Sequence, residues 1–199
     1  MESKRFQVYP PREDTWLLEA FARSAGALRL LEIGTGNGLL ALTAARSGAR
    51  VVATDLNPAA LTELRATSLR EGLGIECVRT DLAAGLGRFD RILANPPYLP
   101  TPSNERDADP GDRLALDGGP DGCRWTARLF AAWPEHLAPD GEAFIVTSTV
   151  QDPRSLARIL APWRSLGGVA QVVARRALEG EVLEVLRCVA PSSRSSGPE

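Results

Sequence analysis

The chain alternates short runs of β-branched residues or leucine with amphipathic stretches, and this alternation limits its fold more than any other feature. Such alternation is typical of βα units, in which successive strands lie parallel in one sheet. The first four predicted strands cover residues 30–34, 50–54, 75–78 and 91–94. We therefore predict an α/β protein built on a mostly parallel sheet.

The segment between the second and third predicted strands has clear helix-boundary signals. Asn57 is a favourable N-cap, Pro58 suits the first helical position, and Gly72 can end the helix. The predicted apolar face of this helix carries Leu61, Leu64 and Leu69. Further helices are predicted over 122–137 and 155–163.

The C-terminal third predicts the remaining strands. A turn at 139–141 leads into a strand at 143–146, and two β-rich segments follow at 169–173 and 182–189. The stretch 175–181 between the last two is too short for a parallel crossover, so they should form an antiparallel hairpin at one end of the sheet. The expected architecture is a seven-stranded sheet with the last strand reversed and helices on both faces.

A chain of 199 residues fits one compact domain, which we assign to residues 1–190. Residues 191–199 have little to bury and are expected to be disordered. No apolar run approaches the roughly 20 residues of a membrane-spanning helix, and the N-terminus shows no secretory-signal pattern. These features predict a cytoplasmic protein without a membrane partner.

Composition excludes several classes of function. Cys77, Cys123 and Cys188 lie far apart, and His136 is the only histidine, so a disulfide framework and a zinc site are both disfavoured. A net charge of −2 and a pI of about 5.6 argue against a protein that wraps nucleic acid. A neutral substrate or a protein partner, with no metal, fits this composition better.

Residues 31–38 place three glycines, Gly34, Gly36 and Gly38, between a predicted strand and a helix. Without side chains there, a ligand can lie against the backbone at the carboxyl end of the strand. The spacing is G-x-G-x-G, and Leu39 stands where the dinucleotide fingerprint has its third glycine. A pyrophosphate-binding loop is therefore disfavoured.

Acidic residues stand at the ends of the first three predicted strands. Asp55 could accept hydrogen bonds from ribose hydroxyls, a role common to sites for NAD and for S-adenosylmethionine. Asp81 could accept from an adenine amino group while Leu82 packs on the ring, which favours S-adenosylmethionine. Glu32, buried by position, needs a cationic or hydrogen-bonding partner, which a ligand with an ammonium and a sulfonium supplies. Alternatively, Asp55 and Asp81 only cap helices or turns.

Residues 95–98, Asn-Pro-Pro-Tyr, follow the fourth predicted strand. The prolines remove two backbone donors, so the Asn95 side chain and the Pro96 carbonyl can both accept hydrogen bonds from one planar NH2 group. Tyr98 can stack on that group, with Pro97 beside it, and direct the nitrogen toward a methyl donor. The catalytic residues predicted on this basis are Asn95, Pro96 and Tyr98; the predicted substrate-binding residues are Asn95, Pro97 and Tyr98. Alternatively, the motif is a rigid loop with a surface tyrosine.

Three segments resemble one family. Residues 95–98 and 31–38, together with residues 8–18 (V-Y-P-P-R-E-D-T-W-L-L), are similar to the HemK/PrmC-type N(5)-glutamine methyltransferases, and the likeness extends over 8–189. It is greatest to the short single-domain branch, which methylates the Gly-Gly-Gln glutamine of class 1 release factors. Residues 1–28 are too few for the additional N-terminal domain of the bacterial branch and are expected to cover the cofactor.

The resemblance implies a class I S-adenosylmethionine-dependent methyltransferase, a Rossmann-like fold that needs no metal. It implies cofactor contacts at Thr15, Glu32, Gly34, Gly36, Asp55, Asp81, Leu82 and Asn95. It also implies a small zinc-binding activator that pairs with the edge of the third strand, an edge that the glycines at 72 and 74 would leave open. An ordinary covered edge remains an equal alternative.

The chain departs from the family pattern beside the expected substrate entrance. Leu116 replaces a tryptophan. The segment 101–117 is acidic through Glu105, Asp107, Asp109, Asp112 and Asp117. Glycines at 118, 119 and 122 match the G-G-x-x-G of the short branch.

Other functions stay open. The change at Leu116 suggests a methyltransferase of a small-molecule or peptide natural product. An adenine methyltransferase could use the same tetrapeptide, although the charge balance opposes it, and a non-catalytic scaffold could retain the fold. Phe89, Trp125 and Trp133 are expected in the core, and His136 is expected to cap a helix.

Overall fold

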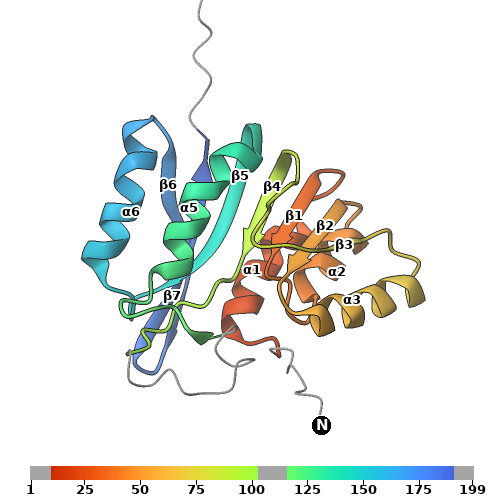
Figure 1. Cartoon of the computed structure of the whole chain (residues 1–199), viewed down its shortest axis with the longest axis horizontal. Helices are drawn as coiled ribbons and strands as arrows, with labels where there is room; N and C mark the ends of the chain where they lie inside the picture. The colour runs from red at the N-terminus through yellow and green to blue at the C-terminus, as the bar shows by residue number, and fades with distance from the viewer. Residues whose placement is uncertain (1–9, 103–115, 191–199) are drawn as a thin grey trace, which may run out of the picture.

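The computed structural model describes residues 10–102 and 116–190 and contains a seven-stranded sheet (Figure 1). The strands are β1 (Arg29–Ile33), β2 (Arg50–Asp55), β3 (Glu76–Arg79), β4 (Phe89–Ala94), β5 (Leu137–Ser148), β6 (Val169–Leu178) and β7 (Glu181–Val189). The helices are α1 (Glu13–Arg23), α2 (Leu39–Arg46), α3 (Pro58–Arg70), α5 (Arg124–His136) and α6 (Pro153–Ser165). The tail at 191–199, predicted to be disordered, lies outside the described residues.

The strand order is β3-β2-β1-β4-β5-β7-β6. The first five strands pair in parallel, and β7 pairs antiparallel with both β5 and β6. The predicted mostly parallel sheet with a reversed last strand is therefore confirmed, as is the terminal hairpin. Because β7 inserts between β5 and β6, the sixth strand forms the edge of the sheet.

Apolar residues cover both faces of this sheet. One cluster joins Phe89 and Trp133 with Trp163 beneath α5 and α6, and the other joins Leu18, Leu40 and neighbours beneath α1, α2 and α3. In the second half of β4, Ile92, Leu93 and Ala94 alternate between the clusters, as the period of two in a strand requires. The core positions predicted for Phe89 and Trp133 are confirmed.

Helix α3 begins as predicted, since the Asn57 side chain accepts from Ala59 N at 2.9 Å and Pro58 occupies the first turn. Its predicted apolar face is wrong at one position. Leu64 is buried, but Leu69 is 74 % exposed. Ser68, four residues after Leu64, takes the inward position, because residues four apart share a helix face.

Two local features differ from the sequence prediction. The predicted turn at 139–141 lies within β5, where four residues bulge opposite Asp90 and Asp140 has a φ of 62°. The strand resumes its parallel register at Glu142. The sequence analysis also assigned no helix to residues 13–23, which form α1.

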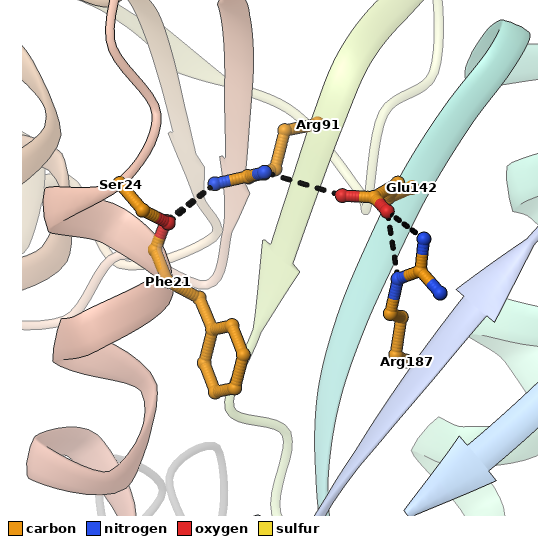
Figure 2. A network of polar contacts seen from close by, with 5 residues as sticks. All are labelled: Phe21, Ser24, Arg91, Glu142 and Arg187. Atoms are coloured by element: carbon orange, nitrogen blue, oxygen red, sulfur yellow. Dashed lines mark hydrogen bonds and ion pairs between the residues drawn. The ribbon is translucent and has the colours of Figure 1, made fainter. Parts of the chain in front are cut away.

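Helix α1 is fixed to the sheet by packing and by a polar network (Figure 2). Phe21 stacks on Phe144 with 4.4 Å between ring centroids. Arg91 donates to Phe21 O at 2.8 Å and to Ser24 Oγ at 3.0 Å, and pairs with Glu142 at 3.2 Å. Glu142 also pairs with Arg187. Arg91 thus satisfies a carbonyl in the last turn of α1 and attaches that end of the helix to the sheet.

We expect Arg91→Met to reduce the free energy of unfolding by about 1–3 kcal/mol, because it leaves the Phe21 carbonyl and the Glu142 carboxylate without this buried donor. The matched control, Arg175→Met, removes an exposed pair with Glu184 and should cost at most about 1 kcal/mol. Urea unfolding of both variants measures the difference. Equal losses would contradict a special role for the network.

Candidate active site

A single cavity of about 1250 Å³, including its open mouth, lies at the carboxyl ends of β1, β2 and β4. Ligands of open α/β sheets bind at this position, where the strand order reverses. The cavity brings together every residue that the sequence analysis assigned to the site. These residues are Thr15, Glu32, Gly34, Gly36, Asp55, Asp81, Leu82, Asn95, Pro96, Pro97 and Tyr98.

The glycines after β1 adopt backbone conformations that L side chains rarely adopt, with φ of 72° at Gly34, 51° at Gly36 and 78° at Gly38. Gly34 and Gly38 serve different purposes. A Cβ at Gly34, which lines the cavity, would meet no atom within 4 Å, so it would occupy space that a ligand can use. A Cβ at Gly38 would lie 2.6 Å from Leu64 Cδ1. Gly38 therefore permits close packing of α2 on α3.

Asp55 holds the glycine loop in place. Its Oδ2 accepts from Gly36 N at 2.9 Å, and its Oδ1 accepts from Asn57 N at 2.8 Å. The sequence analysis left open that Asp55 caps a turn, and these two hydrogen bonds show that it does. Each carboxylate oxygen can accept a second hydrogen bond, so this turn role leaves room for ligand hydroxyls.

Glu32 is buried beneath the glycine loop with 3 % exposure. Its Oε2 accepts from Thr35 Oγ1 at 2.7 Å and from Ala41 N at 2.9 Å, so hydrogen-bonding partners come from the loop and from α2. Burial raises the pKa of Glu32 to about 8; these two hydrogen bonds oppose the rise, and the charge of Asp55 adds to it. A cationic ligand beside this carboxyl would favour its ionised form.

Asp81 and Leu82 form the far wall of the cavity. Asp81 is exposed, and its Oδ2 accepts from Arg128 Nη2 at 2.6 Å. Leu82 has a φ of 52°, unusual for leucine, and its carbonyl accepts from Thr54 Oγ1 at 2.8 Å. This hydrogen bond holds Leu82 against the cavity.

Helix α5 carries two residues that the sequence analysis placed outside the site, Trp125 in the core and His136 at a helix cap. The core assignment of Trp125 is wrong, because the ring is half-buried, lines the cavity and lies 4.8 Å beneath the Arg128 guanidinium. His136 ends α5, has Nδ1 3.3 Å from Gly87 O and does not line the cavity. This contact is with a carbonyl outside α5, so the helix cap expected of His136 stays a prediction.

Asn95 stands directly after β4 and presents its side chain to the cavity. Its Nδ2 donates to Thr15 Oγ1 at 3.4 Å. Its Oδ1 is buried and has no hydrogen-bond partner within residues 10–102 and 116–190. A buried acceptor without a donor costs about 1–3 kcal/mol, so this oxygen favours a ligand that brings an N–H.

Sequence reasoning missed Asp14, which is 4 % exposed and lines the cavity. Its Oδ1 accepts from Thr15 N at 2.6 Å, and its Oδ2 accepts from the Tyr98 hydroxyl at 3.4 Å. An acid in the first turn of a helix is ordinarily an exposed complement to the helix dipole. The sequence therefore offered no signal that Asp14 is buried beside Tyr98.

Two exposed apolar side chains line the cavity. Leu99 and Leu116 line it and are 39 % and 38 % exposed. The acids Glu105, Asp107, Asp109 and Asp112 lie outside the described residues. The last acid of that segment, Asp117, is buried and pairs with Arg124 at 2.9 Å, so it is not part of an exposed acidic surface.

Two further findings apply to the described part of the chain. It contains no group of three or more His, Cys, Asp or Glu side chains that could hold a metal ion. None of its helices combines the length and the apolar character needed to cross a membrane.

The fold and this cavity define a class I S-adenosylmethionine-dependent methyltransferase. Residues 14–108 match the methyltransferase small domain family. The chain is 33 % identical to MJ0928 of Methanocaldococcus jannaschii, a candidate protein N5-glutamine methyltransferase, over 90 % of each chain. It is 35 % identical to mouse methyltransferase HEMK2, covering 90 % of this chain and 88 % of that protein. The chain belongs to the HemK/PrmC-type N5-glutamine methyltransferases.

Two further comparisons extend this likeness. The release factor glutamine methyltransferase of Deinococcus radiodurans is 39 % identical over 83 % of this chain, which spans 61 % of that protein. The solved E. cuniculi Mtq2-Trm112 complex, described as responsible for methylation of the termination factor eRF1, superposes with a TM-score of 0.69. At 24 % identity over 92 % of this chain and 98 % of that one, the superposition shows a common fold.

The raised pKa of Glu32 predicts how stability depends on pH. The folded state keeps a proton that the unfolded state releases between pH 4.5 and about 8, so the parent should lose stability as pH rises through this range. Glu32→Gln lacks that titration and should gain stability relative to the parent between pH 5 and pH 8. Urea unfolding of the ligand-free proteins measures this difference. Parallel pH profiles would contradict the buried, protonated Glu32.

Proposed function

We propose that this enzyme transfers a methyl group from S-adenosylmethionine to the side-chain amide nitrogen of the glutamine in the Gly-Gly-Gln motif of a peptide chain release factor. The family and the names of its relatives support this reaction. The observation that carries it is the buried Oδ1 of Asn95, a residue that lines the cavity, because this acceptor has no donor among the described residues. A glutamine amide brings the N–H group that this oxygen needs.

The residues around the glycine loop suit the cofactor. Gly34 leaves space beside the backbone, Gly36 lines the same cavity, and Asp55 can accept from ribose hydroxyls. Glu32 and Thr15 suit the charged methionine end, since an ammonium or sulfonium stabilises a buried carboxylate. When bound, this cofactor supplies an electrophilic methyl group.

Asp81 and Leu82 complete the proposed cofactor site at the adenine end. Leu82 offers an apolar face, and its strained backbone conformation keeps it at the cavity wall. Asp81 bonds Arg128 through Oδ2, and its second oxygen can accept from an adenine amino group.

The substrate amide would be held by Asn95 Oδ1 and the Pro96 carbonyl, each accepting one of its two N–H groups. These acceptors stabilise the positive charge that develops on nitrogen during transfer, so no base has to remove a proton before the transfer; the methylated amide then loses one N–H proton to solvent. Tyr98, with Pro97 beside it, stacks on the amide, and Asp14 accepts from the Tyr98 hydroxyl and so fixes the ring. Asp14 is thus a positioning residue for Tyr98.

We further propose that residues 1–190 form the methyltransferase domain and that the segment before β1, including α1, covers the cofactor. Strand β3 lies at the end of the sheet and could pair with a small zinc-binding activator. The Mtq2-Trm112 assembly of the structural neighbour supports such a partner. Methylation of release factors would place the enzyme in the cytoplasm.

Methyl transfer to a release factor tests the proposed substrate. With tritiated S-adenosylmethionine, we expect label on a release factor that presents Gly-Gly-Gln and only background on its Gly-Gly-Glu variant, which has no amide. Free glutamine should be a poor substrate, because residues flanking the side chain contribute binding energy. Greater labelling of duplex DNA would favour an adenine methyltransferase instead. Labelling confined to small molecules of a cell extract would favour a natural-product enzyme.

Substitutions at Asn95 separate orientation by an acceptor from catalysis by a base. We expect Asn95→Ala to lower turnover by roughly 100-fold or more with a smaller change in cofactor affinity, because one of two amide acceptors is lost. Asn95→Asp keeps an acceptor and adds a charge, so its rate should lie between the alanine variant and the parent. Single-turnover kinetics and calorimetry measure the two effects. An Asp variant faster than the parent, with a steep pH dependence, would indicate a general base.

A further inference from the structure

The turn at residues 117–122 lies directly against the backbone that leaves the Asn-Pro-Pro-Tyr motif. Gly118 N donates to Leu99 O at 3.0 Å, and Thr101 N donates to Gly119 O at 2.8 Å. Residues 99 and 117 form a parallel β-bridge. Residues 117–119 therefore lie beside residues 99–101, which follow Tyr98.

Two glycines of this turn have no room for a side chain. A Cβ at Gly118 would lie 2.7 Å from Leu99 O and 2.8 Å from Tyr98 C, and one at Gly122 would lie 2.4 Å from Tyr98 O. These neighbours are backbone atoms, which cannot move aside as the end of a flexible side chain can. Any side chain at either position must displace Tyr98 or the turn.

The turn is also fixed on its other sides. Asp117, buried at 7 % exposure, accepts from Gly119 N at 2.8 Å and from Arg124 at 2.9 Å, and its carbonyl accepts from Trp125 Nε1 at 3.1 Å. These contacts attach the turn to the start of α5. A displacement of the turn would therefore disturb buried polar groups, so Tyr98 is the part left to move.

Gln151 attaches the turn to the end of β5. It is 3 % exposed, donates Nε2 to Gly122 O at 2.7 Å and accepts from Ser148 N at 3.0 Å. Its Cγ would lie 3.2 Å from a Cβ at Gly122. The turn is thus held from β5 as well as from α5.

We propose that Gly118, Gly122 and Gln151 are positioning residues for methyl transfer, which set the backbone of Tyr98 and thereby the place where the substrate amide binds. The proposal rests on the function proposed above. None of the three lines the cavity, whereas Tyr98 does, so they can act on the reaction only through Tyr98 and not by contact with the substrate. A change in this turn should affect turnover and leave the cofactor end of the cavity intact.

Gly118→Ala tests this role, because Gly118 does not have a positive φ and the added methyl group acts through backbone contacts with Tyr98, Leu99 and the Cα of Gly122. Displacement of a reacting group by about 1 Å can cost about 100-fold, so we expect turnover on the release factor to fall by about 10- to 100-fold. Affinity for S-adenosylhomocysteine, measured by calorimetry, should stay within about two-fold of the parent. Gly87→Ala is the matched control, since its Cβ would make only ordinary contacts with the Arg29 side chain, and it should match the parent.

A second pair of variants covers the case in which Gly118→Ala does not fold. Gln151→Glu replaces the donor to the Gly122 carbonyl with an acceptor and should show the same separation of turnover from cofactor affinity. Gln171→Glu, on the exposed edge strand β6, is its control. Normal turnover in both Gly118→Ala and Gln151→Glu would overturn the proposal, and so would a loss of cofactor affinity as large as the loss of turnover.

The positioning role of the turn can be tested even if the proposed substrate is wrong. A parent that binds S-adenosylhomocysteine but methylates no release factor would refute the substrate assignment alone. In that case a crystal structure of Gly118→Ala decides the positioning role. A Tyr98 backbone displaced from its parent position supports it, and an unchanged Tyr98 overturns it.

Discussion

The parallel pairing of β1 with β4 is the interaction on which the site depends. These strands are far apart in sequence, yet Ile33 lies opposite Ala94 in the ladder. The next residue on each strand therefore begins one half of the site, Gly34 at the glycine loop and Asn95 at the Asn-Pro-Pro-Tyr motif. Because the strands are parallel, both halves lie at the same edge of the sheet, where the strand order reverses.

Much of this arrangement could be predicted from the sequence because strand ends carry their own signals. Asp55 and Asp81 follow recognisable strands, and parallel connectivity brings such ends together. Asp14 and Trp125 could not be placed in this way. Their positions depend on contacts between distant segments, such as Tyr98 with Asp14 across 84 residues, which no local pattern encodes. The wrong prediction that Leu69 faces the core has a smaller, local cause. An offset of one residue in the assumed helix period rotates a side chain off the buried face.

The buried polar groups of the site differ in whether they have hydrogen-bond partners within the described part of the chain. Glu32 accepts from Thr35 and Ala41, so its desolvation is partly offset within the protein. Asn95 Oδ1 has no such donor among the described residues. In the proposed function Glu32 belongs to the cofactor end, which is largely organised by hydrogen bonds already present, and Asn95 belongs to the substrate end, which retains an acceptor without a donor among the described residues. Under that proposal a substrate amide supplies the donor that Asn95 Oδ1 lacks, so binding energy is directed to the reacting nitrogen.

Tyr98 stands where two independent supports meet. Its hydroxyl donates to Asp14 on α1, a helix whose last turn is bonded to Arg91 of the sheet. Its backbone lies against the turn that contains Gly118, which is attached to α5. A ring fixed at its hydroxyl alone could still pivot, and a backbone fixed alone would leave the ring free to change rotamer. Only the two constraints together fix the plane of the Tyr98 ring, so under the proposed function the helix before the first strand and the turn after residue 116 act on the same chemical step.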